Sequence, residues 1–243
     1  MASQIPIAYC GPPPVPSDLF RSWNLDPWLL GLLALVAVAG FMASGLTRGR
    51  RIALLAAVGV LAVAFVSPLC PLTTALFSAR GAHHLLLYAA AAPLLALAMP
   101  LKTRVSGSLA FAISTVALWV WHLPPVYSAA LADTGVYWLL QSFLLASGWL
   151  FWAQVLGARS SPLSGLPMVA LGAGQMGLLA AVLTFAPAPL YAEHLLTTGA
   201  FGLSPLEDQQ LSGLIMWAPG TAVFLFVALW LGQRSWARLA WPT

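Results

Sequence analysis

Long apolar stretches separated by isolated charges dominate the chain. A membrane-spanning helix needs about 20 mostly apolar residues. Seven charge-free runs are that long, and they are residues 27–47, 52–79, 81–101, 105–132, 134–158, 160–192 and 209–233. Each predicts one spanning helix. The run 160–192 begins and ends with loop-like sequence, SSPLSGLP and PAPL, so its helix is expected near 167–186.

The stretch 195–206 is too short to span a bilayer and contains Gly and Pro, so we expect a re-entrant or interfacial segment there.

The amino-acid composition agrees with this pattern of apolar runs. Hydrophobic residues make up 60% of the 243 residues and charged residues 7%, whereas a soluble domain has about 25% charged residues. A soluble protein, a disordered chain and a nucleic-acid-binding module are thereby excluded. The fold class predicted is all-α, a polytopic transmembrane bundle of about seven helices in the lipid bilayer.

The basic residues predict the orientation of the bundle. With seven spans, eight of the ten basic residues fall on one side: Arg48, Arg50, Arg51, Lys102, Arg104, Arg159, Arg234 and Arg238. Only Arg21 and Arg80 fall on the other. Positively charged loops stay in the cytoplasm, so we expect the N-terminus outside and the C-terminus in the cytoplasm. The expected parts are an extracytoplasmic tail 1–26, a transmembrane domain 27–233 and a cytoplasmic tail 234–243, in a bacterial inner (plasma) membrane.

In this arrangement the residues that carry most of the polar chemistry gather on the outer side. All six acids, all four histidines and both cysteines lie there. The positive-inside rule explains the acids, but it does not govern neutral histidines or cysteines. Imidazole and thiol ligands suit copper, zinc or haem iron rather than magnesium or calcium. The candidate metal ligands are Cys70, His83, His84 and His122, and copper is the possible metal.

Other interpretations of the same residues stay open. Cys70 and the histidines also fit a buried small hydrophobe and hydrogen-bonded imidazoles. Cys10 could join Cys70 in a disulfide if the outer side is oxidising, which would remove the thiol as a ligand. His122, in WHLPPVY, is expected to hydrogen-bond the turn that the two prolines break.

The remaining polar and aromatic positions favour structural roles. Trp119, Trp121 and Tyr127 fit an interfacial aromatic belt, and His194 is expected at the surface. Gln175, near the middle of a span, is expected to hydrogen-bond between helices. We expect no acidic or basic residue deep within a span, which argues against a proton relay or a charged-substrate transporter. No nucleophile, phosphate-loop or zinc-protease motif occurs, so we expect no enzymatic activity.

Several sequence blocks resemble the CtaG-type cytochrome c oxidase assembly factors, a polytopic family first associated with caa-type oxidases. The blocks are FVSPLC, LFSARGAHHLLLYAAAAPLLAL, WHLPPVYSAALADTGVYWLLQSFLLASGWLFWAQVLG and DQQLSGLIMWAPG. They occur in family order between residues 60 and 235. The resemblance implies maturation of a haem–copper oxidase, with oxidase subunits as partners and help for copper to reach one of them.

The matching positions carry the resemblance further. His84 and Pro93 match one family helix, and the outer HxPxxY-like turn is matched by His122, Pro124 and Tyr127. The last block is matched by Asp208, Gln209, Gln210, Met216, Trp217 and Pro219. The chain departs from the family where Arg80 replaces a common histidine, where Gln141 and Ser142 replace a Glu-His pair, and where Cys70 replaces a common acid.

Two further functions remain as alternatives to a copper-passing assembly factor. The first is a metal-free structural or accessory subunit of a respiratory or other membrane complex, for which clustered ligands would be absent. The second is a small-molecule or metal-ion channel, which would need a polar path through the midplane, where Gln175 is the single candidate. If copper is carried, Cu(I) is the expected state, because thiol and imidazole ligands favour it.

Overall fold

The computed structural model describes residues 8–157 and 165–240, and this part of the chain contains helices and loops but no strand. The helices are α1 Pro27–Met42, α2 Arg48–Phe65, α3 Leu69–Ala75, α4 Phe77–Leu85, α5 Ala92–Ala98, α6 Gly107–Trp121, α7 Pro124–Ala132, α8 Thr134–Leu156, α9 Leu166–Thr184 and α10 Pro205–Ala240. Short helical turns occur at Leu19–Arg21, Ala192–His194 and Thr198–Phe201, and a π-helical turn, Leu86–Ala91, joins α4 to α5. The all-α bundle predicted from the apolar runs is confirmed.

Each of the seven apolar runs contains helix. Four helical segments are long and apolar enough to cross a membrane: Phe77–Ala98, Thr134–Leu156, Leu166–Thr184 and Pro205–Trp236. Two bent pairs, α2 with α3 and α6 with α7, raise that number to six if each pair is one span. The seventh segment, α1, is a shorter apolar helix of 16 residues. The chain is thus a multi-pass membrane protein by the length and composition of its helices.

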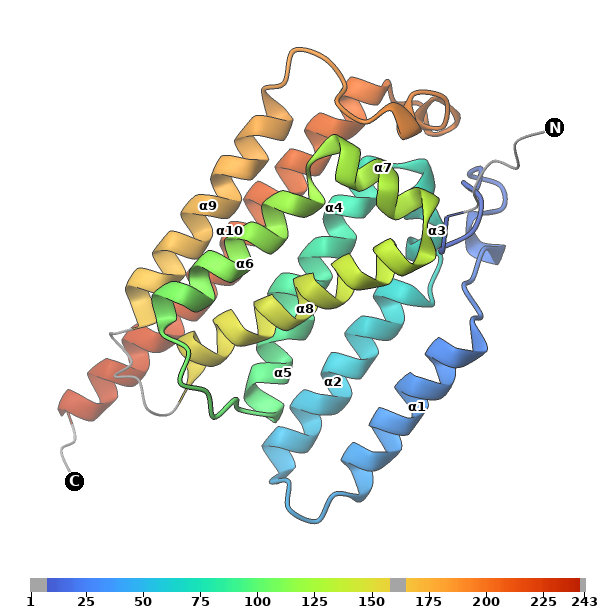
Figure 1. Cartoon of the computed structure of the whole chain (residues 1–243). Helices are drawn as coiled ribbons and strands as arrows, with labels where there is room; N and C mark the ends of the chain where they lie inside the picture. The colour runs from blue at the N-terminus through green and yellow to red at the C-terminus, as the bar shows by residue number, and fades with distance from the viewer. Residues whose placement is uncertain (1–7, 158–164, 241–243) are drawn as a thin grey trace.

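Consecutive segments run up and down the bundle in alternation (Figure 1). The start of α4, the end of α6 and the start of α10 therefore meet at one end, which we call the histidine end. The opposite end, where α2 begins and α5 ends, carries Arg48, Arg50 and Arg51. This separation of the three arginines from the histidines agrees with the predicted topology, while the side of the membrane that each end faces stays a prediction.

Local sequence signals explain where the helices begin and bend. Asp26 accepts hydrogen bonds from the amides of Trp28 and Leu29, so it caps α1, and Asp133 caps α8 through the amide of Val136. Helix α2 meets α3 at an angle of 41° at a break containing Ser67 and Pro68, and α6 meets α7 at 73° before Pro124. Prolines impose both bends because they cannot continue a helical hydrogen-bond ladder.

The π-helical turn lies one turn before Pro93, whose nitrogen has no hydrogen to donate to a preceding carbonyl. Trp152 on α8 donates from its Nε1 to the carbonyl of Tyr88 at 2.7 Å. A side chain from a neighbouring helix therefore satisfies a backbone group within this irregular turn. The turn follows the two histidines directly along the same continuous helical segment.

Candidate functional site

At the histidine end, the N-terminus of α4 is capped by a residue from another helix. Leu76, the residue before α4, has no side-chain group that could cap the helix. Asp208 on α10 takes this role, because its carboxylate accepts hydrogen bonds from the amides of Phe77 (2.6 Å) and Ser78 (3.1 Å) and from the Ser78 hydroxyl. The carboxylate is fully buried. Asp208 thus links α10 to the start of α4, and the two histidines follow one to two turns later on the same helix.

His84 and His122 lie next to each other although 38 positions separate them. Their ring centroids are 5.4 Å apart, and the ring planes are nearly perpendicular. Both side chains are buried, with 1% and 6% of their surface exposed. His122 Nδ1 lies 2.7 Å from the carbonyl oxygen of Leu118, so Nδ1 carries the proton and Nε2 keeps its lone pair. Nε2 of His122 and both ring nitrogens of His84 have no hydrogen-bond partner.

A metal-binding role of these two imidazoles stays a prediction, and one feature of His122 fits it. A metal-bound histidine usually donates its second ring N–H to a carbonyl or carboxylate, which fixes the tautomer, and His122 does this with Leu118. The centroid distance of 5.4 Å between the nearly perpendicular rings is also the ordinary geometry of packed aromatic rings, which prefer separations of about 4.5 to 7 Å. The unpartnered nitrogens are the groups that a metal ion would bind.

His83 is the third histidine of this region. It is fully buried, and neither ring nitrogen has a hydrogen-bond partner. Its ring contacts Phe65 at a centroid distance of 4.9 Å and the His84 ring at 5.9 Å. As expected for adjacent helical positions, the two rings point in different directions. Within the described ranges, no group of three or more His, Cys, Asp or Glu side chains is arranged to hold a metal ion.

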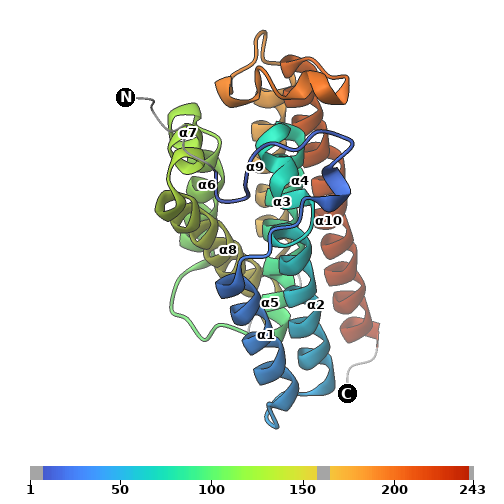
Figure 2. The same cartoon turned by 90° about the vertical axis from the view of Figure 1, so that its right-hand side faces the viewer.

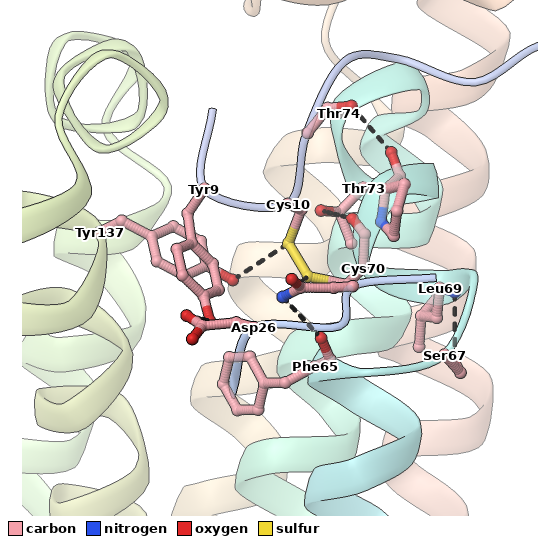
Figure 3. The surroundings of a disulfide bond; sticks show 12 residues. Tyr9, Cys10, Asp26, Phe65, Ser67, Leu69, Cys70, Thr73, Thr74 and Tyr137 are labelled. Carbon is pink, nitrogen blue, oxygen red and sulfur yellow. Dashed lines mark hydrogen bonds between the residues drawn. A yellow bond between two sulfur atoms is a disulfide. The ribbon is translucent and has the colours of Figure 1, made fainter. Parts of the chain in front are cut away.

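Cys70 is fully buried on α3, and its sulfur is bonded to that of Cys10 (Figure 3). The disulfide, which the sequence left open, is therefore present. The Tyr137 hydroxyl lies 3.5 Å from the Cys10 sulfur. As a disulfide sulfur, Cys70 provides no thiolate for a metal ion.

The disulfide holds an N-terminal strap, residues 8–26, across the histidine end beside α3 (Figure 2). Tyr9 stacks on Tyr137 and donates a 2.7 Å hydrogen bond to Asp26; accepting it lowers the pKa of Asp26. Burial, followed by this hydrogen bond, raises the pKa of Tyr9. Asn24 donates to the carbonyl of Phe65 at 3.0 Å. The strap is thus fastened beside Phe65, the residue that contacts His83.

Arg80 differs most from its expected position. We predicted it in an outer turn, but it lies inside α4 with no exposed surface. Its guanidinium lies 5.7, 6.0 and 5.6 Å from the ring centroids of Trp121, Tyr127 and Tyr137. Arg80 and Asp208 each lie in the first turn of a candidate span, Phe77–Ala98 and Pro205–Trp236, rather than deep within it, but protein atoms bury both of them completely. The error for Arg80 arose because the charge-free run ended at residue 79, whereas the helix begins at Phe77.

His194 is buried rather than at the surface, with 2% exposure. Its Nε2 lies 2.7 Å from the Tyr127 hydroxyl. The loop that carries it also supplies Tyr191, whose hydroxyl donates to the carbonyl of His122 at 2.8 Å. The stretch between α9 and α10 therefore folds onto the histidine end, and no residue pattern in the sequence signalled that contact.

Three other side-chain expectations are corrected. Trp121 and Tyr127 are fully buried instead of forming an interfacial belt, because the bend between α6 and α7 turns them toward Arg80 and His84. Gln175 has 9% exposure, and its amide has no hydrogen-bond partner, so the expected interhelical bond is not formed. Gln141 is also buried with both amide atoms unpartnered. The predicted hydrogen bond from His122 to the broken turn is present.

One family model matches the chain over residues 105–238, more than half of its length, and it describes the cytochrome c oxidase caa3 assembly factor, Caa3_CtaG. The matched range runs from the loop before α6 to α10 and includes His122 and Asp208, while His83, His84 and Cys70 lie before it. No curated protein and no solved structure matches the chain. The chain therefore belongs to the caa3-type cytochrome c oxidase assembly factor family.

Proposed function

We propose that this membrane protein assists assembly of a haem–copper cytochrome c oxidase by binding Cu(I) between His84 and His122 and passing it to an oxidase subunit. Membership of the caa3 assembly factor family supports the assembly role. The observation that carries the copper step is the buried imidazole pair, with ring centroids 5.4 Å apart and unpartnered nitrogens on both rings.

The chemistry of the pair favours Cu(I) over harder ions. Imidazole suits copper, whereas magnesium and calcium prefer oxygen ligands. The pair would supply two of the ligands of the ion. His83 is the candidate third ligand, through a change of side-chain rotamer. Cys70 joins the proposed set only when the disulfide to Cys10 is reduced.

The proposed role is binding and delivery rather than catalysis. Two neutral ligands release an ion more readily than a closed set of four, which suits transfer to a second protein. Transfer takes place at the histidine end, and the distribution of basic residues supports an extracytoplasmic position for that end in a bacterial inner membrane.

A test in cells compares oxidase assembly with and without the ligand pair. In a strain lacking the chain, we expect the parent protein to restore cytochrome c oxidase activity. We expect the His84→Ala, His122→Ala variant to leave activity lower by about tenfold or more, because removing ligands abolishes binding. His194→Gln is the matched control, since it changes a buried histidine outside the pair. Full oxidase activity with the double variant at normal abundance would contradict the copper step and favour a metal-free scaffold.

A further inference from the structure

An apolar groove runs between the α4–α5 segment and α10 on the outside of the bundle. Helix α10 packs along α4 and α9 but barely contacts α5, and the far ends of α5 and α10 lie apart (Figure 1). Two cavities of about 350 and 370 Å³ lie between the two segments. Both are lined by Ala89, Ala90 and Val223, so they form one continuous groove, which we call the α5–α10 groove.

The length and the lining of the α5–α10 groove suit the acyl chain of a lipid. One wall extends from Ala82 to Leu97 and the other from Ile215 to Trp230, and every lining side chain is apolar. Each wall corresponds to about 22 Å of helix, whereas the hydrocarbon of one leaflet is about 15 Å thick. Leu97 and Phe226 are 43% and 70% exposed, so the groove opens sideways to the bilayer.

Arg234 lies at the end of the groove, one helical turn beyond Trp230. Its guanidinium carbon is 4.2 Å from the centroid of the Trp230 ring, which lines the groove. This stacking holds the positive charge beside the opening. All six acids of the chain lie toward the histidine end, so no carboxylate of the described residues competes for this guanidinium. Its N–H groups are therefore available to an anion such as a phosphate.

The other wall of the groove also ends beside an arginine. Arg50 donates a 2.7 Å hydrogen bond from its Nε to the carbonyl oxygen of Ala98, the last residue of α5. Leu97, the residue before Ala98, lines the groove. Arg48 and Arg51 lie at the same end of the bundle. An end that is positively charged and free of acids attracts the headgroups of anionic lipids.

We propose that the α5–α10 groove binds an anionic phospholipid, with its phosphate at Arg234 and an acyl chain along Ala90, Leu94 and Val227. The apolar walls alone would also fit a helix of another membrane protein. The arginine and tryptophan at the end of the groove favour the phospholipid, because its negative group lies at the membrane interface while its acyl chain lies in the hydrocarbon. No candidate copper ligand lines the groove, so this proposal is independent of the copper step.

The first test compares two phospholipids that differ in headgroup charge. Native mass spectrometry of the detergent-purified full chain measures its affinities for phosphatidylglycerol and for phosphatidylcholine with the same acyl chains. We expect the parent protein to bind phosphatidylglycerol about fivefold more tightly, the effect of one arginine near the membrane surface. Arg234→Gln should remove most of this preference. Arg48→Gln is the matched control, since it removes an exposed arginine at the start of α2, outside the groove, and should keep the parent ratio.

The second test concerns the acyl chain. Ala90→Phe places a ring inside the groove, so we expect weaker binding of both phospholipids. Ala112→Phe adds the same ring at an exposed position of α6 and should leave both affinities unchanged. Equal affinity of the parent for the two lipids, or a preference that Arg234→Gln does not change, would overturn the proposal and leave the groove to a partner helix. Lipid binding unaffected by Ala90→Phe would overturn the groove as the acyl-chain site.

Discussion

At the residue scale, His194 predicts a pH dependence of stability. Burial lowers the pKa of its imidazole from 6.5 to about 4. In the unfolded chain the imidazole is protonated below about pH 6.5, so between pH 4 and 6.5 the unfolded state binds more protons than the folded state. The stabilisation from the buried neutral ring is therefore complete above this window and is lost as the pH falls through it.

The measurement is the thermal unfolding temperature of the detergent-purified protein between pH 4 and 8. We expect the parent protein to become less stable below pH 6.5 and the His194→Gln variant to lose less stability over the same range. Glutamine does not titrate, and its amide can still hydrogen-bond the Tyr127 hydroxyl. Identical pH profiles for the two proteins would show that His194 is not the group responsible.

The burial of Arg80 and of His194 could not be predicted from the sequence. Arg80 and His194 were placed by counting along the chain, which shows that a residue lies between apolar runs but not what folds over it. Arg80 is buried because rings from α6, α7 and α8 converge on it, and His194 is buried because its loop returns to α7. Contacts of this kind join residues far apart in sequence, and no local period encodes them. His122, whose hydrogen bond is local, was predicted correctly.

At the element scale, the start of α4 depends on a residue from another helix. Asp208→Ala removes the acceptor for two backbone amides and the Ser78 hydroxyl. Loss of a helix cap costs about 0.5 to 2 kcal/mol, and a buried unsatisfied donor adds to this. We expect lower unfolding stability and faster amide hydrogen exchange at Phe77 and Ser78. Asp208→Asn should be milder, because its amide oxygen still accepts; exchange at α4 unchanged in Asp208→Ala would contradict the capping role.

The strap and the disulfide form a second element that can be tested. The bond links residues 60 positions apart, and a disulfide that closes a long loop contributes about 2 to 4 kcal/mol. We expect Cys10→Ser to lower stability and to speed hydrogen exchange across residues 8–26, while copper binding by His84 and His122 persists.

Comparison with Cys70→Ser gives this prediction its control. Both variants break the same disulfide, but only Cys70 was a candidate ligand. Equal copper content in the two variants is expected if the histidine pair binds the ion alone. Copper loss in Cys70→Ser but not in Cys10→Ser would show that the freed Cys70 thiol is a ligand.

At the scale of the whole molecule, the sequence predicted the bundle better than the site. Hydrophobic runs located all seven helical segments because burial in lipid requires long apolar stretches. The prolines of WHLPPVY predicted the break before α7, but the runs did not give its angle or the π-helical turn before Pro93, since these depend on how prolines and neighbouring helices share backbone hydrogen bonds. All four candidate residues, Cys70, His83, His84 and His122, lie at the histidine end, but which of their side chains come into contact depended on those bends.

The central claim is that His84 and His122 together bind Cu(I), and copper content tests it most directly. The detergent-purified protein is loaded with Cu(I) under an inert atmosphere, desalted and subjected to elemental analysis. The parent and the His194→Gln control should retain close to one copper per chain, and His84→Ala, His122→Ala should retain almost none. Equal copper in the double variant and the parent, or none in the parent after loading, would contradict the claim.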